Sequence, residues 1–111
     1  LESRGLGDVY KRQDFTFTTE KDFSIEELNA RLDAAAKNSL SGILDINEIP
    51  LVSTDFGNDA HSVIFDKSHT RKIGKSTKIL AWYDNEWGFS NRMLDVTNYL
   101  NQISKKSPQA A

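Results

Sequence analysis

The chain changes from a strand pattern to a helical one at residues 82–92, which read Trp-Tyr-Asp-Asn-Glu-Trp-Gly-Phe-Ser-Asn-Arg. The apolar run 78–83 before the change is typical of a buried strand. Apolar residues then recur at helical spacing, at Met93, Val96, Leu100 and Ile103. We therefore expect residues 84–91 to form a strand-to-helix turn, where α/β proteins commonly place a ligand.

Asn85 is the candidate binding residue of this turn. A carboxamide offers two donors and an acceptor, so it can pair edge to edge with another amide. Taken alone, the pattern favours a plainer interpretation, in which Asn85 is a turn residue or a helix N-cap.

The N-terminal half predicts a strand followed by a helix. Phe15 and Phe17 alternate with threonines, which indicates a strand that begins at Asp14. Ser24 and Glu27 have the spacing of a capping box, and an apolar face follows at Ile25, Leu28, Leu32, Ala35 and Ala36. We expect this helix to lie across a sheet with its polar face in water.

The middle of the chain predicts further short strands. Residues 43–46 and 62–65 have strand patterns, and residues 57–59 read as a turn between them. The polar, basic segment 67–78 is typical of a solvated hairpin that turns at Gly74. Together the elements predict an α+β fold, with a mixed, mostly antiparallel sheet and helices packed on one face.

Both ends of the chain fall outside this fold. Residues 1–13 carry no clear periodicity, and we interpret them as a non-native or disordered extension. Residues 14–104 form the predicted domain, and residues 105–111 a flexible tail.

Composition limits the classes of function. The 111 residues are 38% apolar and 27% charged, with a net charge of −2, which is typical of a soluble globular protein and gives no reason to expect nucleic acid. No run is long enough for a membrane span and no stretch has the form of a signal peptide, so a cytoplasmic location is the default expectation. The absence of cysteine excludes disulfides, thiolate metal sites and a thiol nucleophile within this chain.

Metal binding receives no support from the sequence. His61 and His69 lie near Asp59 and Asp66, but no spacing among them matches a known metal motif. We therefore expect no metal site among these four residues.

Three segments carry a family resemblance. Residues 82–92 resemble the C-terminal signature of the glyceraldehyde-3-phosphate dehydrogenase family, which includes the erythrose-4-phosphate dehydrogenases. Residues 51–56 and 61–66 also look like that family, in the same order and at similar spacing. The resemblance implies that the chain is a C-terminal fragment of a homotetrameric enzyme. It also implies that the terminal helix packs on a missing N-terminal Rossmann domain.

The same resemblance implies roles for three residues. Asn85 would hydrogen-bond the nicotinamide carboxamide of NAD, Phe89 would lie beside the nicotinamide ring, and Tyr83 would approach the catalytic centre. From the residues alone, Tyr83 is a core strand tyrosine. The family's nucleophilic cysteine and its histidine lie outside this piece, so the chain holds no catalytic residue, and the fragment alone should be inactive.

The family's chemistry is oxidation of a phosphorylated aldehyde through a cysteine thioester, which phosphate or water then releases. Residues 82–85 and 64–66 favour the phosphorylating glyceraldehyde-3-phosphate enzyme of glycolysis. Residues 49–53, 70–71 and 91–95 look more like the erythrose-4-phosphate enzyme, which feeds pyridoxal phosphate synthesis. We favour the glyceraldehyde-3-phosphate enzyme, because its matching residues lie nearer the chemistry, with the erythrose-4-phosphate enzyme as the alternative. The choice between NAD and NADP stays open. A third hypothesis is a non-enzymatic interaction module that binds an acidic partner through the basic hairpin.

Overall fold

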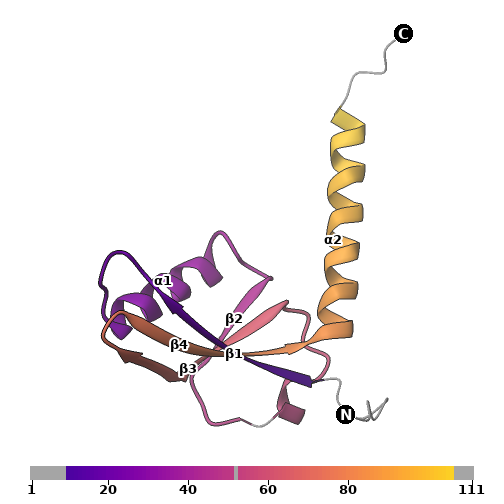
Figure 1. The fold of residues 1–111 in the computed structure, drawn as a ribbon. Helices are drawn as coiled ribbons and strands as arrows, with labels where there is room; N and C mark the ends of the chain where they lie inside the picture. The colour runs from indigo at the N-terminus through magenta and orange to yellow at the C-terminus, as the bar shows by residue number, and fades with distance from the viewer. Residues whose placement is uncertain (1–9, 52, 107–111) are drawn as a thin grey trace.

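The computed structural model describes residues 10–51 and 53–106 (Figure 1). Along the chain the elements are β1 (Tyr10–Thr18), α1 (Ile25–Lys37), β2 (Leu44–Asn47), the 3₁₀ helix η1 (Ser53–Phe56), β3 (Val63–Ile73), β4 (Ser76–Asp84) and α2 (Asn85–Lys106). The predictions for residues 1–9 and 107–111 lie outside the described residues.

The strands form one mixed sheet in the order β1-β4-β3-β2. β4 pairs antiparallel with both β1 and β3, whereas β2 pairs parallel with β3. Helix α1 contacts β2 and β3 and covers one face of the sheet (Figure 1). The predicted α+β class with a mostly antiparallel sheet is confirmed.

The first strand begins earlier than predicted. Tyr10 pairs with Asp84 and Gln13 with Ala81, so residues 10–13 belong to β1 and their assignment to an extension outside the fold was wrong. β1 is an edge strand, and its side chains from Lys11 to Asp14 are exposed. Backbone pairing at such an edge requires no alternation of apolar residues, which is why the polar stretch gave no strand signal.

Helix α1 begins at the predicted capping box. The Ser24 hydroxyl accepts a hydrogen bond from the Glu27 backbone N–H at 3.0 Å, and the Glu27 carboxylate accepts one from the Ser24 N–H at 2.8 Å. Lys67 of β3 ties the helix to the sheet, since its Nζ lies 2.7 Å from Asp33 Oδ2 and also contacts Glu48. These two carboxylates raise the pKa of Lys67.

β3 and β4 form the hairpin predicted at Gly74, whose φ of +55° suits glycine. β3 is longer than the predicted 62–65, because it continues through the polar residues to Ile73. The pairing is irregular between Asp66 and Arg71. At that irregularity the buried Asp66 accepts hydrogen bonds from Ser68 at 2.7 Å and from the Trp82 indole at 3.1 Å.

The core is formed by residues of β2, β3, β4 and η1. Its buried apolar side chains are Leu44, Phe56, Ile64, Phe65, Leu80 and Ala81. The Phe56 and Trp82 rings stack with centroids 5.1 Å apart, which fixes η1 against β4.

Helix α2 leaves the end of β4 and projects away from the sheet (Figure 1). Its large apolar side chains are exposed, among them Met93, Leu94, Val96, Tyr99 and Leu100. Lys105 and Lys106 lie in its last turn, so the predicted tail does not begin at residue 105. Among the described helices, none combines the length and apolar character needed to cross a membrane.

Candidate functional site at the start of the terminal helix

The helix begins at Asn85, directly after the last residue of β4, so the turn predicted over residues 84–91 does not form. Asp84 makes this direct change possible. Its Oδ1 accepts a hydrogen bond from the Trp87 backbone N–H at 3.1 Å, which satisfies one of the free donors of the first turn. Its Oδ2 accepts one from the backbone N–H of Asn58 at 3.2 Å. Asp84 is therefore the helix cap, a role that the sequence pattern alone offered to Asn85.

Gly88 lets the first turn of α2 approach the loop before β3. It is the buried residue of that helix within the described chain, and a Cβ atom there would stand 2.9 Å from the carbonyl oxygen of His61. Real Cβ atoms essentially never come this close to another heavy atom. The glycine thus permits contact between helix and loop that a larger residue would prevent.

A hollow of about 220 Å³ lies beside this first turn. Its lining residues come from β4, α2 and the loop before β3, and they are Ser62, Tyr83, Asp84, Asn85, Gly88, Phe89 and Arg92. The structure therefore brings the three predicted site residues, Tyr83, Asn85 and Phe89, to one surface. Phe89 is 65% exposed there, whereas Tyr83 is half-buried.

The Asn85 side chain is exposed at this hollow. Within residues 10–51 and 53–106 its carboxamide makes no hydrogen bond, whereas the Asn91 carboxamide donates to the Trp87 carbonyl at 2.9 Å. As far as the described residues show, both donors and the acceptor of Asn85 can therefore meet a ligand.

Arg92, which also lines the hollow, is held by two contacts. Its Nη1 donates to the Gly42 carbonyl at 2.8 Å, and its Nη2 lies 2.8 Å from Asp95 Oδ2, as the helical spacing predicts. The guanidinium therefore holds the second turn of α2 near the start of β2.

Sequence reasoning missed the two residues that shape this site, Asp84 and Gly88. A signal for Asp84 was present, because aspartate before a helical pattern is a preferred N-cap. No comparable local signal marks Gly88, since its role depends on His61, which is distant in sequence.

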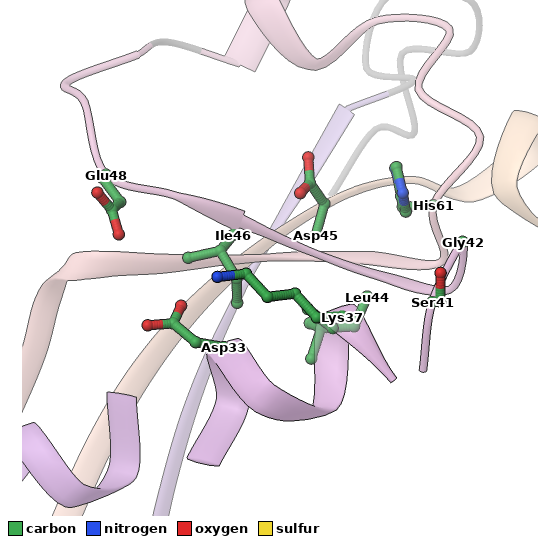
Figure 2. Close-up of a pocket in the computed structure, with 10 residues that line it drawn as sticks. Asp33, Lys37, Ser41, Gly42, Leu44, Asp45, Ile46, Glu48 and His61 are labelled. Atoms are coloured by element: carbon green, nitrogen blue, oxygen red, sulfur yellow. The ribbon is translucent and has the colours of Figure 1, made fainter. Parts of the chain in front are cut away.

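A second hollow, of about 330 Å³, lies between α1 and β2 (Figure 2). Asp45 and His61 line it, and Asp45, Asp59 and His61 offer ligand atoms that all lie within 4.8 Å of one another. No sequence pattern predicted that Asp45 lies beside the other two. Asp59 Oδ1 already accepts a hydrogen bond from the His61 backbone N–H at 2.8 Å and lies 2.7 Å from its Nδ1. The contacts between Asp59 and His61 therefore have a structural role, because they stabilise the loop before β3.

The basic hairpin is largely neutralised by its own neighbours. Lys72 pairs with Asp22 at 2.5 Å and Lys78 with Asp14 at 2.5 Å, while Lys67 pairs with two carboxylates. Three cations of the segment are thus engaged within the chain. This weakens the hypothesis of an interaction module that binds an acidic partner.

The chain matches the family described as "Glyceraldehyde 3-phosphate dehydrogenase, C-terminal domain" over residues 9–85. It belongs to the glyceraldehyde-3-phosphate dehydrogenase family. The match begins one residue before β1 and ends at Asn85, so the predicted binding residue is the last one covered, and Phe89 lies beyond it.

Members of the glyceraldehyde-3-phosphate dehydrogenase family resemble this chain closely. A "Glyceraldehyde-3-phosphate dehydrogenase, chromosomal" of Cupriavidus necator is 51% identical over 83 residues, which is 75% of this chain and 25% of the relative. The Pseudomonas aeruginosa "Glyceraldehyde-3-phosphate dehydrogenase" is 50% identical over 82 residues, 74% of this chain and 24% of the relative. The chain thus spans about a quarter of the length of the curated relatives that it matches.

Proposed function

We propose that this chain forms the C-terminal part of an NAD-dependent glyceraldehyde-3-phosphate dehydrogenase. The observation that carries the proposal is the exposed carboxamide of Asn85, which makes no hydrogen bond to any described residue and lines the same hollow as Phe89 and Tyr83. The family membership and the names of the close relatives support the reaction class.

In this proposal Asn85 recognises the nicotinamide of NAD, whose ring accepts the electrons of the oxidised aldehyde. The ring carries a carboxamide, and two carboxamides can exchange paired hydrogen bonds. Such a pair fixes which face of the ring meets the substrate. The orientation of the ring matters because hydride transfer from the substrate to NAD requires the donor and acceptor carbons to be in contact and aligned.

Phe89 and Tyr83 complete the proposed cofactor wall. The exposed Phe89 ring offers an apolar surface to the nicotinamide. Tyr83 lies one residue before the Asp84 cap, on the strand that leads into the hollow, and we place it near the reacting centre.

The proposed substrate is a phosphorylated aldehyde, glyceraldehyde 3-phosphate. The route needs a thiolate nucleophile, and none of the 111 residues is cysteine. The nucleophile and its histidine would therefore come from other parts of the full-length enzyme.

We also propose that an N-terminal Rossmann domain covers the exposed apolar side of α2, and that the whole enzyme is a cytoplasmic homotetramer.

The test is Asn85→Ala in the full-length enzyme that carries this chain. Loss of the hydrogen-bonding partner should cost about 1 to 3 kcal/mol of transition-state stabilisation, measured as a fall in kcat/KM for NAD. The melting temperature should change little. Asn101→Ala is the matched control, because Asn101 is another exposed asparagine of α2 and lies outside the hollow. Equal kinetics for the two variants would remove Asn85 from the cofactor site.

A further inference from the structure

We propose that Asp84 is a positioning residue that sets where Asn85 presents its carboxamide. The inference rests on the proposed function, because it takes Asn85 as the cofactor-binding residue. It adds that the side chain before Asn85 fixes the geometry of the site by joining helix α2 to the loop at residues 57–61.

The two oxygens of Asp84 serve two different parts of the molecule. Oδ1 accepts from the Trp87 N–H in the helix at 3.1 Å, and Oδ2 accepts from the Asn58 N–H in the loop at 3.2 Å. The residue is only 4% exposed. Among the described residues no cationic side chain pairs with it, so these N–H groups and the N-terminal end of the helix compensate its charge. A capping residue alone would need only the first of these bonds.

The loop that Asp84 binds is itself stabilised by contacts among its own residues. Asn58 has a φ of +59°, a left-handed conformation that asparagine tolerates better than most residues. Asp59 Oδ1 then accepts from the His61 N–H at 2.8 Å and lies 2.7 Å from the His61 ring. This places the His61 carbonyl against Gly88, one helical turn beyond Asp84.

Asn85 lies between these two contacts of helix and loop. Its own side chain has no partner in the described part of the chain, so nothing at the carboxamide itself fixes its place. The position of the carboxamide therefore depends on the backbone of Asn85. That backbone lies between Asp84 and Trp87, which are joined by the hydrogen bond from the Trp87 N–H to Asp84 Oδ1. If the Asp84–Asn58 bond is lost, the first turn can shift relative to the sheet without the helix unfolding.

Asp84→Ser tests this in the full-length enzyme. Serine is also a preferred N-cap, so it keeps an acceptor for the helix, but it lacks the second oxygen that reaches Asn58. Displacement of a positioned group by about 1 Å can cost up to roughly a hundredfold in rate. We expect kcat/KM for NAD to fall roughly tenfold or more. Asp84→Asn, which keeps the side-chain size but turns a donor toward one N–H, is the second variant should Asp84→Ser fail to fold.

Ser24→Ala is the matched control for stability. It removes the cap of α1, which lies away from the hollow, and so lowers the stability of the fold without changing a residue of the site. We expect Ser24→Ala to lower the melting temperature and leave kcat/KM for NAD unchanged. If both variants lower kcat/KM in proportion to their loss of stability, Asp84 is only a structural cap and the inference is overturned.

The double variant Asp84→Ser with Asn85→Ala separates this inference from the proposed function. If Asp84 acts through Asn85, the double variant loses no more activity than Asn85→Ala alone, because the positioned group is already gone. Additive losses would overturn the inference and leave the proposed function intact. An Asn85→Ala enzyme with unchanged kinetics would instead overturn the proposed cofactor site, and the positioning role with it.

Discussion

The carbonyl oxygen of His61 lies 2.9 Å from the point where a Cβ atom on Gly88 would stand. In an ordinary helix, alanine is more stable than glycine by about 1 kcal/mol. Here the obstacle is backbone, which cannot rotate away as a side chain would. We therefore expect Gly88→Ala to destabilise the 111-residue chain by about 1 to 3 kcal/mol, the range for overpacking. Denaturant unfolding measures this, with Gln102→Ala at an exposed helix position as the control. A more stable Gly88→Ala chain would show that the loop yields freely.

Acid should weaken the fold through Asp66. Burial raises the pKa of this carboxyl. Hydrogen bonds from Ser68, His69 and Trp82 together lower the pKa by more than burial raises it, so the pKa of Asp66 in the folded chain is below its ordinary value. The unfolded chain therefore binds this proton more tightly than the folded chain. The stability that Asp66 contributes is complete above the unfolded pKa of about 4 and is lost as the pH falls through the folded pKa.

The measurement is a melting series from neutral pH to pH 3 on the native chain and on Asp66→Asn. The native chain should lose stability more steeply in acid, while Asp66→Asn should be less stable at neutral pH and flatter below. Asp45→Asn is the control, since Asp45 is an exposed aspartate on β2. Parallel acid slopes for the native chain and Asp66→Asn would assign the acid sensitivity to other carboxylates.

Two N-terminal truncations should behave differently. Removing residues 1–9 leaves every described backbone pair of β1 in place, so the melting temperature should hardly change. Removing residues 1–13 also deletes the pairs from Tyr10 to Gln13 opposite β4, and the Arg12 guanidinium over the Trp82 ring at 5.6 Å. We expect a clear fall in melting temperature for the longer deletion only. Equal stability of the two truncations would show that residues 10–13 add nothing to the sheet.

The exposed side of α2 should bind a hydrophobic dye in the isolated chain. Met93, Val96 and Leu100 are 56%, 57% and 55% exposed, and they recur at helical spacing. Replacing all three with glutamine should lower dye fluorescence markedly. Ile73→Gln, at an exposed residue of the hairpin, should change it little. Undiminished dye binding by the triple variant would place the apolar surface elsewhere.

Local patterns predicted the elements whose stability is local. The capping box of Ser24 and Glu27 and the Gly74 turn depend on neighbours within a few residues, and the structure confirms both. The family resemblance supplied Asn85, Phe89 and Tyr83, which the structure gathers at one hollow, while their roles stay predictions.

What the sequence did not reveal depends on partners that are distant along the chain. β1 begins at Tyr10 because β4 provides backbone partners, and not because of its own side chains. Asp84 caps α2 and also bonds Asn58, which lies 26 residues away. Asp45 likewise meets His61 only through the parallel pairing of β2 with β3.

The Asp84 cap also bears on the order in which the chain folds. An isolated helix must form its first turn at high entropic cost, because several residues are fixed for a single hydrogen bond. In this chain the first turn starts from Asp84, which is already held in place as the last paired residue of β4. Asp84 also accepts a hydrogen bond from Asn58, in a loop that is distant in sequence. The nucleus of α2 is thus provided by the sheet, so the helix should grow outward from Asn85 only after the β3–β4 hairpin has formed.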